Sequence, residues 1–185
     1  MIPKDYHMPS RSPKHNTRVN LSTVICSDCS FVFTNPLPSE ESYNRFYTEA
    51  YADYYGGIAS SLSDHTKKQI PSYIQRTLDE IEAFLPLNGA QLAEIGPGKG
   101  AFLYWAQRRC GSVLGIEPSK EFYDILVAQE LPCRNMSLEQ LSPEQDQFDI
   151  IVMSHVVEHF YDPNRALALC YNLGNYFLYF LILFT

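Results

Sequence analysis

The sequence has no run of lysine or arginine residues, and its 21 acidic residues outnumber its 14 basic ones, for a formal net charge of -7. Proteins that bind DNA or RNA depend on clustered basic side chains to neutralise phosphates. We therefore expect no nucleic-acid partner. An acidic chain can still bind a small nucleotide-like molecule, because backbone groups and pocket shape recognise such a ligand.

Features of exported proteins are also missing. The first 20 residues contain no apolar stretch typical of a signal peptide. The five cysteines are an odd number, and Cys110, Cys133 and Cys170 stand singly, so no disulfide framework is predicted. A reducing cytoplasm is the expected compartment. With 185 residues, of which 45% are hydrophobic, the chain is long enough for one α/β domain and a short accessory segment.

Three regions follow one another along the chain. Residues 1–20 are polar and are predicted to form a flexible arm. Residues 21–65 contain two short β-type runs around Cys26 and Cys29, which predict a hairpin that turns on the cysteines. A helix is then expected from Ser39 to about Tyr51. The tyrosine-rich stretch at 43–55 is either a helix packed by its aromatic side chains or a lid over a ligand.

Residues 66–185 alternate between strand and helix patterns. A polar loop is predicted at 58–65 and an amphipathic helix over roughly 67–85. Further helices are expected at 100–109, 120–130 and 163–171, and strands at 91–95, 112–117, 132–135 and 148–154. This βαβ rhythm predicts an α/β fold with a Rossmann-like parallel sheet and helices on both faces.

A glycine-rich segment joins the first predicted strand of this region to a helix. Gly96, Gly98 and Gly100 alternate there, and glycine allows both a sharp turn and a close approach of the backbone to a ligand. The helix that follows presents free N–H groups to a polar ligand. Glu117 ends the next strand, where a carboxylate can bind the two hydroxyls of a ribose.

Two nucleotide-like ligands fit this pattern. The spacing Gly96-x-Gly98-x-x-Ala101 also matches a dinucleotide fingerprint, which would make the protein an NAD(P)-dependent oxidoreductase. Glu94 favours S-adenosylmethionine (SAM), because a carboxylate there suits a ligand with a sulfonium and an ammonium group better than one with a pyrophosphate.

The residues resemble the motifs of class I SAM-dependent methyltransferases. The first motif spans 92–100, the second-strand motif 115–119, and the fourth-strand motif 148–159. The resemblance implies SAM as cofactor and a small-molecule acceptor, with a sugar as one candidate. It implies that the cofactor contacts Glu94, Gly96, Pro97, Gly98, Gly100, Glu117, Pro118, Met136, Ser137, Ser154 and His155.

Two histidines of the fourth-strand motif follow its predicted strand at 148–154. His159, and less directly His155, are candidate catalytic bases for a hydroxyl acceptor. The alternative for His159 is a capping or packing role. Residues 155–159 also match a zinc-protease pattern, but that pattern needs one continuous helix, whereas here it follows a strand directly.

The Cys26-x-x-Cys29 segment is similar to the N-terminal part of methyltransferases from sugar and cell-surface glycan pathways. In that group, a second cysteine pair completes a zinc ribbon. This chain lacks the second pair, and only His7 and His15 precede Cys26 as further candidate ligands. Because a structural zinc site needs four ligands, we expect two free thiols and no bound metal.

The last 20 residues carry no charge. A membrane helix and a strand buried on both faces both fit this composition, and the interruptions at Asn172, Gly174 and Asn175 favour a strand. We therefore expect no membrane partner. The resemblance implies seven strands, of which the sequence supplies about five, so the predicted fold is incomplete at the C-terminus. This suggests a truncated product, and the alternative to an active methyltransferase is a domain that at most binds SAM.

Overall fold

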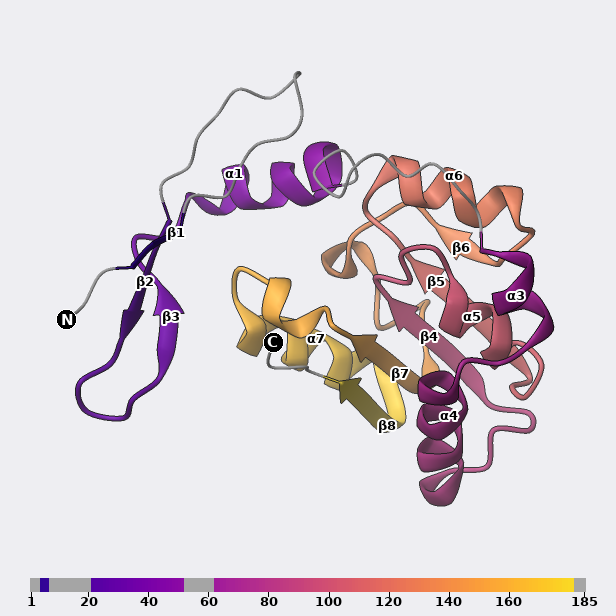
Figure 1. Ribbon diagram of the computed structural model, residues 1–185. Coiled ribbons are helices and arrows are strands. Elements are labelled where there is room, and N and C mark those ends of the chain that lie inside the picture. Colours follow the sequence, from indigo (N-terminus) through magenta and orange to yellow (C-terminus); the bar gives the residue numbers. More distant parts are fainter. Residues whose placement is uncertain (1–3, 7–20, 52–61, 182–185) are drawn as a thin grey trace. The chain divides into compact units, whose positions relative to one another are not determined.

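The computed structural model describes residues 4–6, 21–51 and 62–181. The chain divides into two compact units, residues 1–58 and 59–185. The strands of the two units form separate sheets, one antiparallel and one parallel (Figure 1).

The first unit begins with a three-stranded antiparallel sheet. Its strands are β1 (Lys4–Tyr6), β2 (Leu21–Ile25) and β3 (Val32–Thr34), in that order across the sheet. The predicted hairpin on the cysteines is confirmed, because Cys26 N–H donates to the Phe31 carbonyl at 2.8 Å and Ser30 N–H to the Cys26 carbonyl at 2.9 Å. Within the predicted flexible arm, Lys4–Tyr6 pairs with β2. The rest of that arm lies outside the described residues.

A helical segment follows in the same unit. It comprises α1 (Glu40–Arg45) and the π-helical turn η1 (Phe46–Ala50). The predicted start at Ser39 is confirmed, since its hydroxyl accepts the Ser42 N–H at 3.3 Å and caps the helix. Aromatic rings pack along this segment, with centroids 5.3 Å apart for Tyr43 and Tyr47. Residues 52–55 of the tyrosine-rich stretch lie outside the described part of the chain.

The second unit contains the predicted parallel sheet. Its strands are β4 (Gln91–Ile95), β5 (Ser112–Ile116), β6 (Cys133–Arg134), β7 (Phe148–Ser154) and β8 (Gly174–Leu181). They are arranged in the order β6-β5-β4-β7-β8, and every neighbouring pair is parallel. Because the strands are parallel, the loops after β4, β5 and β7 lie at one edge of the sheet, and the order in which successive strands are added reverses at β4.

Helices cover both faces of this sheet. They are α3 (Asp64–Lys68), α4 (Ser72–Phe84), α5 (Ala101–Ala106), α6 (Lys120–Ala128) and α7 (Pro163–Leu173), with 3-10 turns η2 (Leu138–Gln140) and η3 (Val157–His159). Successive residues of β4 pack into two different hydrophobic cores. Leu92 packs with buried side chains of α4, α5 and α6, whereas Ala93 packs with those of α7 and η2. The predicted α/β fold is confirmed.

The structure corrects the single helix predicted over 67–85. The chain forms α3, capped by the Ser63 hydroxyl, which accepts the Thr66 N–H at 3.1 Å, and then α4 after a break. Proline disfavours helical backbone in the residue before it, so Pro71 separates the two helices. The loop predicted at 58–65 therefore overlaps the start of α3. The Trp105 indole N–H donates to the Thr66 carbonyl at 2.9 Å and holds α3 against α5.

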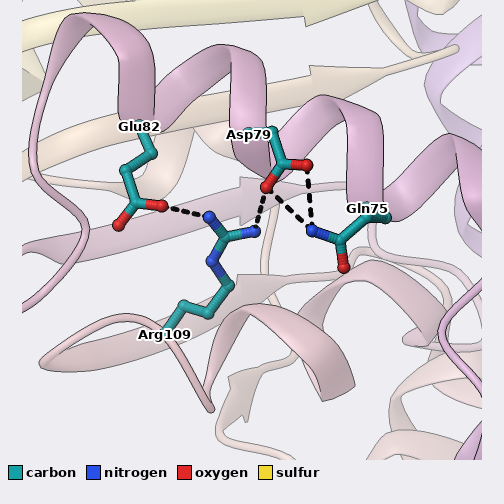
Figure 2. Close-up of polar contacts among 4 residues, drawn as sticks. All are labelled: Gln75, Asp79, Glu82 and Arg109. Carbon is teal, nitrogen blue, oxygen red and sulfur yellow. Dashed lines mark hydrogen bonds and ion pairs between the residues drawn. The ribbon is translucent and has the colours of Figure 1, made fainter.

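Arg109 joins α4 to the turn that follows α5. Its guanidinium pairs with Asp79 at 2.7 Å and also with Glu82, and both carboxylates lie on α4 (Figure 2). The Gln75 amide donates to both oxygens of Asp79, at 2.8 and 2.9 Å (Figure 2). This network ties α4 to the turn between α5 and β5, at the edge of the sheet where β4 and β5 begin.

Residues 174–181 of the uncharged C-terminal stretch form β8, parallel to β7, so the prediction of a strand is confirmed there. Among the described residues, no helix is both long and apolar enough to cross a membrane. The preceding helix α7 starts as predicted, with the Asp162 carboxylate accepting the Arg165 N–H at 3.1 Å and Pro163 in the first turn.

Candidate functional site

The loop from β4 to α5 lies at the carboxyl edge of the parallel sheet. β4 is flanked by β5 and β7, and the three strands are in register through Ile95, Ile116 and Met153 near their ends. In open α/β sheets, ligands bind outside the carboxyl ends of the strands where the strand order reverses. The glycine-rich segment 96–100 occupies this position.

The loop glycines serve different purposes. Gly96, Gly98 and Gly100 all have positive φ, at +67°, +54° and +82°. A Cβ on Gly96 would lie 2.8 Å from Val156 Cγ2, and one on Gly100 would lie 2.5 Å from Leu131 Cδ1, so these two are required by packing. A Cβ on Gly98 would meet nothing closer than a Phe122 ring carbon at 4.0 Å. The space beside Gly98 is therefore open to a ligand.

Glu117 immediately follows β5 and links two loops. Its carboxylate accepts the Gly98 N–H at 3.2 Å and the Ser119 N–H at 2.9 Å. The side chain is buried, which raises the pKa of Glu117 to about 7, although the N–H donors of Ser119 and Gly98 act in the opposite direction. A carboxylate has about four acceptor positions, so capacity remains for ligand hydroxyls.

Glu94 lies near the end of β4 and is only 4% exposed. Its Oε2 is buried and has no hydrogen-bond partner among the described residues. Burial raises the pKa of Glu94 to about 8; the backbone at Leu103 lowers it and the charge of Glu117 raises it further. An unpartnered buried polar atom costs about 1–3 kcal/mol, so a ligand that donates a hydrogen bond there would remove this cost.

The loop after β6 is tied to the loop after β5. The Asn135 amide donates to the carbonyls of Glu117 at 2.9 Å and Pro118 at 3.1 Å. Next to it, Met136 is half-buried against the core on the α7 face, and the Ser137 N–H donates to the Gln140 carboxamide at 2.8 Å. Pro118, Met136 and Ser137 are therefore close in space to Glu117, although they come from two separate loops.

Sequence reasoning assigned no role to Ser119. Its N–H binds the Glu117 carboxylate, and its hydroxyl accepts from the Phe122 N–H at 3.5 Å at the start of α6. A serine directly before a helical pattern is a capping signal, and that signal could have identified Ser119 as a positioning residue.

The end of β7 carries the two candidate catalytic histidines. Ser154 ends the strand and His155 follows with a positive φ of 56°. His155 Nδ1 lies 4.0 Å from Glu158 Oε1. His159 is half-buried in η3, and burial lowers the pKa of its imidazole, an effect opposed by Glu158 and assisted by His155. The structure thus brings His155, Glu158 and His159 together next to the end of β7.

The same geometry bears on the zinc-protease pattern at 155–159. The left-handed backbone at His155 is followed by a 3-10 turn of three residues. The two histidines therefore do not lie on one face of a continuous α-helix, which a zinc protease requires.

Cys26 and Cys29 have free thiols in the turn of the hairpin. Within the described ranges 4–6, 21–51 and 62–181, no three or more histidine, cysteine, aspartate or glutamate side chains gather in a way that could hold a metal ion. His7 and His15 lie outside these ranges. The absence of bound zinc stays a prediction.

Comparison with known proteins gives a family match for the part of the chain that contains this site. Residues 93–174 match a family described as methyltransferase domain. The mitochondrial ubiquinone biosynthesis O-methyltransferase of Bos taurus is 27% identical over 123 residues, which cover 61% of this chain and 33% of the relative. The ubiquinone biosynthesis O-methyltransferase of Cereibacter sphaeroides is 28% identical over 116 residues, covering 60% and 46%. The chain thus spans between a third and a half of the curated relatives it matches.

Solved structures agree on the fold. The plantazolicin methyltransferase BpumL in complex with SAH superimposes with a TM-score of 0.55 at 12% identity, over 76% of this chain and 57% of that one. The same enzyme with a monoazolic desmethylPZN analog and SAH gives a TM-score of 0.53 at 13% identity, over 76% and 59%. Residues 93–174 are thus similar to a methyltransferase domain family, and the second unit has the fold of these solved methyltransferases.

Proposed function

We propose that this chain binds SAM at the loop between β4 and α5 and transfers its methyl group to a hydroxyl group of a small molecule. The observation that carries the proposal is the buried Glu94 carboxyl, whose Oε2 has no partner among the described residues, near a glycine loop with open space beside Gly98. A site with a buried, unpartnered carboxyl oxygen fits a ligand that carries a positively charged hydrogen-bond donor.

The residues around the loop supply complementary contacts to the parts of SAM. Glu94 is placed to accept from the ammonium group, and the remaining acceptor positions of Glu117 suit the ribose hydroxyls. Gly98 lets the backbone approach the ligand closely. We assign the following residues to the cofactor site: Glu94, Gly96, Pro97, Gly98, Gly100, Glu117, Pro118, Met136, Ser137, Ser154 and His155.

The same charge distribution disfavours a dinucleotide. A pyrophosphate carries negative charge and needs N–H donors or cations near the glycine loop. Glu94 and Glu117 are both buried beside this loop, and one of its N–H groups, that of Gly98, already donates to Glu117. This arrangement supports SAM over NAD(P).

The chemistry at the site consists mainly of alignment. SAM supplies a methyl group already activated by its sulfonium, and the protein orients the acceptor and keeps water away. A hydroxyl acceptor must also lose a proton. His159 suits this task because its lowered pKa keeps the imidazole neutral at neutral pH, and a neutral imidazole can accept a proton. His155 is the second candidate, since it lies at the end of β7 beside Glu158.

Two observations favour a hydroxyl as the acceptor. The curated relatives are named as O-methyltransferases of ubiquinone biosynthesis. Separately, the Cys26-x-x-Cys29 segment is similar to that of methyltransferases from sugar pathways. A sugar and a quinone precursor are therefore the two acceptor classes to test. We place the protein in the cytoplasm on the basis of its five free cysteines.

Binding and turnover test the proposal separately. Titration calorimetry of the purified chain with SAM, its demethylated product and NAD should show binding of the first two only. Transfer of isotope-labelled methyl from SAM to hydroxylated sugars and to quinone-precursor phenols should then identify the acceptor. SAM binding without turnover on any acceptor would favour a domain that only binds the cofactor. Binding of NAD without SAM would contradict the proposal.

A further inference from the structure

The two carboxyl groups of the proposed cofactor site are buried and have no positively charged partner in the described part of the chain. Glu94 is 4% exposed and Glu117 is 5% exposed. None of the ion pairs among the described residues includes either side chain. Burying ionised carboxylates without compensation is costly, and a second negative charge nearby raises the cost.

The groups on the surrounding elements do not supply the missing positive charge. On α4, burial raises the pKa of the Tyr73 phenol, and the charge of Glu94 raises it further. On β6, burial raises the pKa of the Cys133 thiol, and the charge of Glu117 raises it further. The register partner of Glu94 on β7 is the apolar Val152.

Two cationic residues on neighbouring segments are either paired elsewhere or exposed. The guanidinium of Arg134, on β6, pairs with Asp146 at 2.6 Å. Lys99, in the glycine loop, is exposed to solvent. The acids therefore face neutral or acidic titratable groups.

The two acids differ in their hydrogen bonds. Glu117 accepts two backbone N–H groups, from Gly98 and Ser119, which favour its charged form. Glu94 has an oxygen without a partner among the described residues and is the more deeply buried of the two. Glu94 is thus the better position for a proton.

We propose that the ligand-free protein holds a proton on the Glu94–Glu117 carboxyl pair, predominantly on Glu94, and exchanges it for the positive charge of the cofactor on binding. This inference rests on the proposed function. In the exchange, the carboxyl O–H bond breaks, the proton passes to the solvent, and the resulting carboxylate accepts from the ammonium group of SAM. The raised pKa values of Glu94 and Glu117, about 8 and about 7, agree with a proton held at neutral pH.

The exchange makes binding dependent on pH in one direction. Where the carboxyl is protonated, the affinity for SAM should rise with pH by up to about tenfold per pH unit for each proton released. The range between about pH 5.5 and 7 is the most informative, because the α-amino group of SAM stays largely protonated there. A site whose two acids were already ionised would show no such rise.

Calorimetry in buffers of different ionisation enthalpy measures the protons released on SAM binding by the full chain. We expect about one proton per SAM near pH 6.5, and we expect Glu94→Gln to remove most of this release. Glu139→Gln is the matched control, because Glu139 is exposed in η2 and lies outside the cofactor site. This control should release as many protons as the unchanged chain.

A measurement on the ligand-free protein covers the case in which Glu94→Gln does not fold. Infrared difference spectra of the unchanged chain between acidic and alkaline pH should show the band of a protonated carboxyl that persists at neutral pH. Absence of this band would overturn the inference. SAM binding without buffer-dependent heat would also overturn it while leaving the proposed function intact, whereas absence of SAM binding would overturn the proposed function itself.

Discussion

The Glu117 carboxylate accepts a hydrogen bond from the Gly98 N–H at 3.2 Å. This bond joins the end of β5 to the glycine loop after β4, so the acid that we propose for ribose binding also holds this loop. Ser119 supports the same carboxylate from the start of α6. A residue that we propose to bind the cofactor therefore also holds the glycine loop in place.

Replacing this carboxylate should weaken SAM binding strongly. Glu117→Ala removes acceptors for the ribose and releases the loop, and each hydrogen bond to a charged group contributes about 1.5–3 kcal/mol. We expect the Kd for SAM to rise by at least about 100-fold. Calorimetry measures this change, with Glu139→Ala as the control. An unchanged Kd would remove the ribose assignment.

Two loop glycines should respond differently to alanine. Gly98→Ala adds a methyl group to open space, so stability should fall only by the cost of a left-handed alanine, about 1–2 kcal/mol, while SAM binding is blocked. In Gly100→Ala the added Cβ collides with Leu131 and Leu126, which adds about 1–3 kcal/mol for overpacking. Thermal unfolding and SAM titration of both variants separate the two effects. Equal stability losses would contradict the distinction.

The buried acids should make the ligand-free protein less stable as pH rises. Glu94 and Glu117 have raised pKa values in the folded chain, so the folded state binds more protons than the unfolded state between the ordinary value of 4.5 and about 8. Their contribution to folding stability is fully present below this pH window. It decreases as the pH rises through the window, by on the order of a few kcal/mol in total. Urea unfolding at pH values on either side of the window measures the loss. Glu94→Gln should reduce the dependence of the unfolding free energy on pH. An unfolding free energy that rose with pH over this window would contradict the assignment.

The role of His159 can be separated from packing by kinetics. If His159 is the base, His159→Asn should lower kcat by about 100- to 10,000-fold with little change in SAM affinity. The rate of the unchanged enzyme should fall at acidic pH, below the usual histidine value of 6.5, because burial lowers this pKa. That acidic limb should disappear in the variant. A stability loss with unchanged kcat would instead indicate the capping or packing role.

The Arg109 network should stabilise the position of α4. Arg109→Ala breaks two ion pairs of a partly exposed guanidinium, and we expect a loss of roughly 1 kcal/mol in unfolding free energy (Figure 2). Arg76→Ala is the matched control, since its pair with Glu80 at 3.9 Å is exposed and should contribute less than about 0.5 kcal/mol. Equal losses in the two variants would show that the network adds nothing beyond an ordinary surface pair.

Local sequence patterns were sufficient to predict most of the helices and strands and the glycine loop. Strands β4 and β7 were predicted with the bounds that the structure has, because continuous apolar runs bounded by turn residues are typical of buried parallel strands. The capping residues Ser39 and Asp162 were also recognisable, since an N-cap interacts with residues only a few positions away. The apolar spacing continues across Pro71 and predicts one helix, whereas the structure has a break between α3 and α4 before this proline.

Other properties of the site depend on contacts between distant parts of the chain. The sequence placed Glu94, Gly98 and Glu117 in one ligand site, because glycine spacing and an acid after the next strand are local signals. It contained no sign that Glu94 Oε2 would lack a partner or that Glu117 would bind the Gly98 N–H. Burial, charge compensation and pKa depend on which groups of β5, β6, α4 and α5 surround each carboxyl, and that arrangement exists only once the sheet and its helices have packed.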